Sequence, residues 1–202
     1  TSHDFVQFTQ RWSRAWKKHI APRLPRRLTD IDPTLINAWL QPTLTGLTPL
    51  ETTLRTWSAY AGDLNSTALH EVYQAYIRRM LSPPDQKAAE QLAIAWISDY
   101  LGDDQKLTAD RDTLTELVNA GICRPGSTPK RIVFSCSAVG SFLAARAFSG
   151  SGVPTQITRS PTAIGESLLR SYSGITDAAD IVRARLQDED PDLQRQLLAC
   201  AR

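Results

Sequence analysis

The stretch Thr48–Tyr60, which reads TPLETTLRTWSAY, carries the clearest structural signal in this chain. Thr48 and Glu51 have the spacing of a capping box, in which each side chain accepts a hydrogen bond from the backbone amide of the other residue. Pro49 fits the first helical position, because its missing N–H has no partner to lose there. Apolar side chains follow at helical spacing, namely Leu50, Leu54, Trp57 and Tyr60. The stretch therefore predicts a helix that begins at Pro49.

The same start signal recurs along the chain. A small polar residue is followed at once by proline in six places: Asp32-Pro33, Thr48-Pro49, Ser82-Pro83, Thr128-Pro129, Ser160-Pro161 and Asp190-Pro191. With the apolar spacing around them, these pairs predict helices over residues 4–20, 33–40, 49–60, 67–81, 83–101, 109–120, 129–150, 161–173, 176–187 and 191–201. Residues 121–127 are predicted to form a loop, and only residues 155–158 a short extended piece. We therefore predict an all-α fold.

Composition places the chain among globular proteins. It has 202 residues, of which 42% are hydrophobic, and this predicts one domain with extensions. We expect an N-terminal arm at residues 1–30, a helical core at 31–187 and a C-terminal helical extension at 188–202. The net charge of +2 argues against a strongly basic DNA-binding domain. Three scattered cysteines, no signal-peptide character and no run of about 20 apolar residues predict a soluble intracellular protein without a membrane partner.

Catalytic and cofactor motifs are not supported by the residues. The segment around Ser137 briefly resembles a nucleophile elbow, but all three histidines lie upstream of it and Val139 would crowd the turn. Cys136 lacks the arginine six residues later that a phosphatase nucleophile needs, since that position is Phe142. Histidines and cysteines lack zinc-module spacing, and no glycine-rich loop precedes Lys-Ser or Lys-Thr. We predict no cofactor, no metal and no enzymatic activity, with an unrecognised active site as a third alternative.

Three polar residues stand beside apolar stretches in the second half of the chain, namely Ser98, Arg131 and Asp177. Arg131 is predicted in the first turn of the helix opened by Thr128-Pro129, where a cation is unfavourable unless an anion meets it. Asp177 could hold the guanidinium and leave its other N–H groups for a phosphate, with Ser98 donating a further bond. The alternative is that the three residues are unconnected.

The residues around this trio resemble a known family. The stretch Thr128–Val133 resembles the Pro-x-x-Arg-type helix start in coat proteins of flexuous filamentous plant viruses, the potyvirus, potexvirus and closterovirus groups. The stretches Ala95–Tyr100 and Leu169–Asp177 resemble the regions around that family's Ser and Asp. In the family the Ser, Arg and Asp meet in a groove that holds the single-stranded genome. The resemblance thus implies RNA binding by Ser98, Arg131 and Asp177, with Arg124 and Lys130 close by in the sequence.

The N-terminal segment is compatible with such a function. Its predicted helix has an apolar face made of Phe5, Phe8, Trp12, Trp16 and Ile20. Seven basic residues and no acid lie between Arg11 and Arg27, which indicates either a solvated helix face or an arm that meets an anion. Such an arm can bury its aromatic residues in a neighbouring subunit and give an open, head-to-tail helical polymer. We predict that the apolar face forms the subunit interface.

The expected function is therefore a coat protein that polymerises into a filament, binds single-stranded RNA and resides in the virion and the host cytoplasm. The alternative function is a cytoplasmic helical adaptor or scaffold in a bacterial secretion or regulatory complex, with the tryptophan-rich helix as its docking element.

Overall fold

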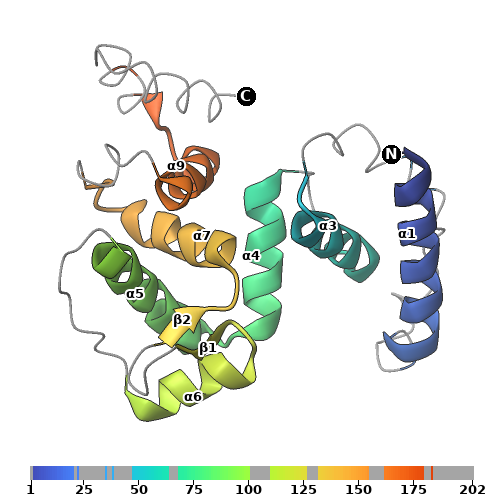
Figure 1. The fold of residues 1–202 in the computed structure, drawn as a ribbon, viewed down its shortest axis with the longest axis horizontal. Helices are drawn as coiled ribbons and strands as arrows, with labels where there is room; N and C mark the ends of the chain where they lie inside the picture. The colour runs from blue at the N-terminus through green and yellow to red at the C-terminus, as the bar shows by residue number, and fades with distance from the viewer. Residues whose placement is uncertain are drawn as a thin grey trace. The chain divides into compact units, whose positions relative to one another are not determined.

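The computed structural model describes residues 2–20, 22, 35, 38, 47–63, 68–100, 110–126, 132–154, 162–179 and 183. Within these residues the chain is helical apart from one two-stranded sheet (Figure 1), which confirms the predicted all-α class. The chain divides into two compact units, residues 1–76 and 77–202. The boundaries that we predicted at residues 30 and 187 lie outside the described residues. No helix in the described part of the chain is long and apolar enough to cross a membrane.

The first unit begins with α1 (Ser2–Ala15), which continues as a π-helical segment, η1 (Trp16–Ile20). Helix α3 (Pro49–Ala61) begins with the predicted capping box: the Glu51 amide donates to Thr48 Oγ1 at 3.3 Å, and the Thr48 amide donates to Glu51 Oε2 at 2.7 Å. The helix ends at Gly62, whose φ of 68° is left-handed and therefore suits glycine. Local residue chemistry thus determines both ends of α3.

Aromatic side chains hold η1 against α3. Trp16 is 2% exposed and Tyr60 is 1% exposed, and their ring centroids lie 5.5 Å apart. Ala61 completes this buried cluster, and partly buried side chains pack around it, namely Trp12, Ile20, Trp57 and Ala59. Because aromatic rings bury large areas, this cluster is a main source of stability for the first unit.

Helix α4 (Leu69–Met80) contains the division between the two units, and α5 (Pro83–Tyr100) and α6 (Arg111–Asn119) follow it. Polar side chains cap α5 and α6, at Ser82 as predicted and at Asp110, which the sequence analysis did not single out as a cap. The Asp85 amide donates to Ser82 Oγ at 3.4 Å, and the Thr113 amide donates to Asp110 Oδ1 at 2.8 Å. The bonds from the Thr113 backbone and hydroxyl lower the pKa of Asp110, because they favour its charged form.

A β-hairpin corrects two of the predicted elements. Strand β1 (Cys123–Pro125) pairs antiparallel with β2 (Ile132–Phe134), so that Arg124 lies opposite Val133. The predicted loop at 121–127 therefore contains a strand, and the helix predicted from Pro129 begins at Ser137 instead. Two β-branched residues and an aromatic one in succession favour a strand once a partner strand is available.

Helix α7 (Ser137–Phe148) lies at the centre of the second unit, between α5 and α9 (Ala163–Ile175) (Figure 1). Most of its residues are buried, as expected for a helix that is apolar on all sides. Gly140 brings its backbone against the rings of Phe134 and Trp96, which meet edge to face at 5.3 Å. Helix α9 is capped by Thr162, which replaces the cap predicted at Ser160.

Other predicted elements lie mostly or wholly outside the described residues. They are the helices at 33–40, 176–187 and 191–201 and the extended piece at 155–158.

Candidate protein-binding groove

The N-terminal helix has two distinct faces inside the first unit. Thr9, Ser13 and Trp16 are spaced four and three residues apart, and all three side chains are buried. Arg14, Lys17 and Lys18 are exposed. This distribution follows from helical spacing, because residues three or four apart share a face. The helix therefore presents one side to its own unit and another to solvent.

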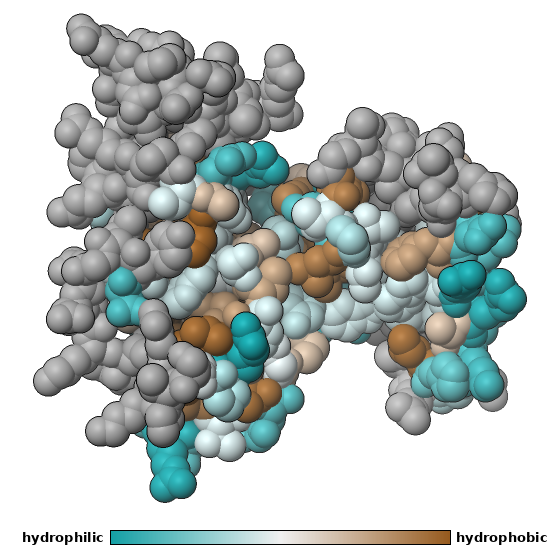
Figure 2. Space-filling view, viewed as in Figure 1, coloured by the Kyte–Doolittle hydropathy of each residue, from teal (hydrophilic) through white to brown (hydrophobic). Residues whose placement is uncertain are grey.

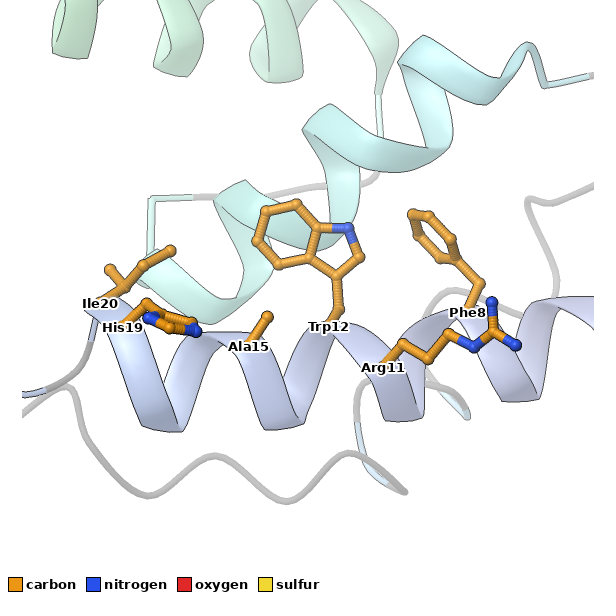
Figure 3. Close-up of a pocket in the computed structure, with 6 residues that line it drawn as sticks. All are labelled: Phe8, Arg11, Trp12, Ala15, His19 and Ile20. Carbon is orange, nitrogen blue, oxygen red and sulfur yellow. The ribbon is translucent and has the colours of Figure 1, made fainter.

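An open groove of about 360 Å³ runs along α1 and η1, and the described residues that line it are Phe8, Arg11, Trp12, Ala15, His19 and Ile20. Figure 3 shows these side chains on the same side of the helix, with Trp12 between Phe8 and Ala15. Phe8, Trp12 and Ile20 are half-buried. The groove therefore presents aromatic and aliphatic surface over about three turns of helix.

Basic side chains border this apolar floor. Arg11 lines the groove, and Arg14 and Lys18 follow it by three and seven residues, which places them along the same flank of the helix. The sequence from Val6 to Ile20 contains no acidic residue. Figure 2 shows hydrophilic surface beside hydrophobic surface over α1. The groove thus has an apolar floor and a positive flank.

The residues predicted to form a subunit interface fall into three groups. Phe8, Trp12 and Ile20 line the groove. Trp16 corrects the prediction, because it is buried against Tyr60 of its own chain and has no exposed surface to offer a neighbour. The side chain of Phe5 lies outside what the structure describes. Helical periodicity predicted the apolar face, but it could not distinguish the residues that α3 covers from those that line the groove.

Only part of the predicted RNA-binding set lies within the described residues, namely Ser98, Arg124 and Asp177. Ser98 is half-buried near the end of α5, and no hydrogen bond or ion pair within the described residues joins it to Asp177. Asp177 is exposed after α9, and its Oδ1 accepts a bond from the Ala179 amide at 2.8 Å. Arg124 is exposed on β1. Lys130 and Arg131 lie outside the described residues.

The predicted helix N-terminus near Arg131 is wrong, because α7 begins only at Ser137. The unfavourable position that called for an anion is therefore absent. The second unit contains a half-buried arginine, Arg146, which the sequence reasoning missed. Its guanidinium contacts the Glu90 carboxylate at 2.8 Å and joins α7 to α5. Nothing in the local sequence links two residues so far apart along the chain.

The buried Cys123 thiol lies in a structural rather than a reactive environment. Burial raises the pKa of the Cys123 thiol to about 12, so that the thiol stays protonated at neutral pH and is a poor nucleophile. In the part of the chain that the structure describes, no three side chains of the metal-binding types cluster together. No protein-family model, curated protein or solved structure matches this chain.

Proposed function

We propose that the protein is a structural assembly protein, a helical scaffold or adaptor that binds an amphipathic helix of another polypeptide in the groove of α1 and η1. The observation that carries this proposal is the open groove with Phe8 and Trp12 on its floor. Half-buried aromatic side chains are the residues that most often dominate the free energy of a protein interface. An apolar groove about three helical turns long can accommodate the apolar face of an amphipathic helix of similar length.

The experiment measures binding of fluorescein-labelled amphipathic helical peptides to the full chain by fluorescence anisotropy. The peptides share one apolar face and differ in net charge. Combined Phe8→Ala and Trp12→Ala substitution should weaken binding by about 100-fold, since each aromatic anchor contributes on the order of 1–2 kcal/mol. Val6→Ala is the matched control, because Val6 is exposed on the same helix and does not line the groove.

Trp12 also touches the buried cluster around Trp16, so the double variant is checked for helicity by circular dichroism. Phe8→Ala alone provides a second test that leaves this cluster intact. The proposal fails if no peptide binds, or if parent, Val6→Ala and groove variants bind all peptides equally.

A filament-forming, RNA-binding coat protein is the second candidate function. It is supported by the exposed Arg124 on the hairpin, since the segment that connects the two strands also carries Lys130 and Arg131. Three cations within one short stretch of sequence, Arg124, Lys130 and Arg131, suit phosphate groups of single-stranded RNA. Under this function, RNA contacts come from a hairpin rather than from a helix N-terminus.

Salt dependence tests this second function. The variant in which Arg124, Lys130 and Arg131 are all replaced by alanine is compared with the parent. The slope of log affinity for single-stranded RNA against log salt concentration should decrease in magnitude by about 0.7 for each lost phosphate contact. Asp177→Asn serves as a control, because Asp177 makes a local hydrogen bond after α9. An unchanged slope in the triple variant, or the absence of any RNA binding, rules this function out.

A further inference from the structure

The charge around the groove restricts what can bind there. Arg11, Arg14 and Lys18 lie along one flank, with the apolar floor beside them. A partner helix must therefore offer aliphatic side chains to Phe8 and Trp12, and carboxylates at the edge of the same face. Complementary charge selects partners and orients them, while like charge across an interface excludes them.

The chain itself contains a segment of this kind. Residues 188–202 read DEDPDLQRQLLACAR, and we call them the acidic segment. Four carboxylates are concentrated at its start, namely Asp188, Glu189, Asp190 and Asp192. Leu193 and Leu197 follow four residues apart, the spacing of one helical face, after a proline at the preferred first helical position. The acidic segment lies outside the described residues.

We propose that the acidic segment of one copy of this chain docks in the groove of α1 and η1 of a second copy. Leu193 and Leu197 then cover Phe8 and Trp12, and the four carboxylates meet Arg11, Arg14 and Lys18. The inference rests on the proposed function and names its partner as a second copy. Because the groove and the acidic segment are different surfaces, each docked copy leaves one of each available, and the contact builds open chains rather than closed pairs.

Two charge-reversal variants of the full chain separate the two halves of this contact. Arg11→Glu with Arg14→Glu alters the groove, and Asp190→Lys with Asp192→Lys alters the acidic segment. Sedimentation velocity over a concentration series should show assembly of the parent and about tenfold or greater weakening in either variant. Matched controls with the same change in charge elsewhere, Arg78→Glu with Lys87→Glu and Asp103→Lys with Asp104→Lys, should assemble like the parent.

Mixing the two variants gives the decisive result. The groove variant keeps its acidic segment, and the segment variant keeps its groove. An equimolar mixture should therefore assemble and grow, because the native segment binds the native groove and the reversed segment binds the reversed groove. Carrying all four substitutions on one chain should restore growth, because the two reversed surfaces attract each other again.

Other outcomes overturn the inference. If the mixture stays monomeric, the acidic segment does not bind the groove of another copy, and a parent that is monomeric at every concentration leads to the same conclusion. If the parent is monomeric but the groove still binds acidic peptides through Phe8 and Trp12, the proposed function stands and only the identity of the partner is wrong.

Discussion

Position 140 shows how one missing side chain shapes the second unit. A Cβ atom on Gly140 would lie 2.8 Å from the Phe134 ring and 3.0 Å from Trp96. Gly140→Ala must therefore displace an edge-to-face aromatic pair. The free-energy cost of this displacement outweighs the gain of about 1 kcal/mol that alanine brings to a helix. We expect a net loss of about 1–2 kcal/mol in the free energy of unfolding, measured in urea.

Gly150 provides the control for this substitution, because a Cβ there would meet no atom within 4 Å. Gly150→Ala should leave the unfolding midpoint close to that of the parent. If Gly140→Ala proves as stable as the parent, the close packing of Phe134 and Trp96 on α7 is wrong.

The Cys123 thiol gives the molecule an alkaline sensitivity. Burial raises its pKa from 9.0 to about 12, so above about pH 9 the unfolded chain loses a proton that the folded chain keeps. This group's stabilisation is therefore complete below pH 9 and is lost as the pH rises toward 12. Between about pH 9 and pH 12, the unfolding free energy of the parent should fall with pH more steeply than that of Cys123→Ala. The difference in slope should be up to about 1.4 kcal/mol per pH unit.

Urea unfolding at a series of alkaline pH values measures this difference. Cys136→Ala is the matched control, because it removes a half-buried thiol and leaves Cys123 in place. Equal slopes for the parent and Cys123→Ala would show that the thiol is not protected by burial.

At the scale of single elements, the capping box of α3 makes a quantitative prediction. Glu51→Ala removes the carboxylate that accepts from the Thr48 amide and should destabilise the chain by about 1 kcal/mol. Glu51→Gln keeps an acceptor oxygen at the same position and should cost less. Thermal unfolding followed at 222 nm compares the two variants; equal losses would mean that charge or packing, rather than the cap, explains the effect.

The helix starts also show what a sequence can reveal about its elements. Thr48 and Asp110 satisfy amides only three residues away, so their helices could be predicted from local chemistry. Ile132 pairs with Pro125 across a connecting segment, and that pairing has no local signal. Local spacing therefore predicts a helix where the chain forms a strand, and the predicted helix N-terminus near Arg131 is wrong for the same reason. Local capping was predictable, whereas long-range pairing was not.

At the scale of the whole molecule, the same distinction applies to the groove. Periodicity predicted the apolar face that contains Phe8, Trp12 and Ile20, and composition predicted its basic flank. Periodicity could not predict that Trp16 packs against Tyr60, because that contact depends on how α3 lies against η1. The residues available to a partner are therefore those that remain after the first unit has formed its own core.

This division of the apolar face makes a prediction about the two compact units. Trp16→Ala should destabilise the first unit by about 3–5 kcal/mol, because it removes a buried ring from the Trp16–Tyr60 cluster. Hydrogen exchange should accelerate in the amides of α1 and α3, while those of α7, which packs against α5 and α9 in the second unit, keep their protection. Val6→Ala should leave both sets of amides unchanged.

The dependence on protein concentration separates a core role for Trp16 from an interface role. A side chain buried in its own unit stabilises α1 and α3 equally at every concentration, since the contact is intramolecular. A side chain buried in a neighbouring copy protects these helices only where copies associate. Faster exchange in Trp16→Ala at the lowest measurable concentration therefore supports the core role. If the amides of α1 and α3 exchange at the same rate in parent and variant at low protein concentration and differ only at high concentration, Trp16 belongs to the contact between copies.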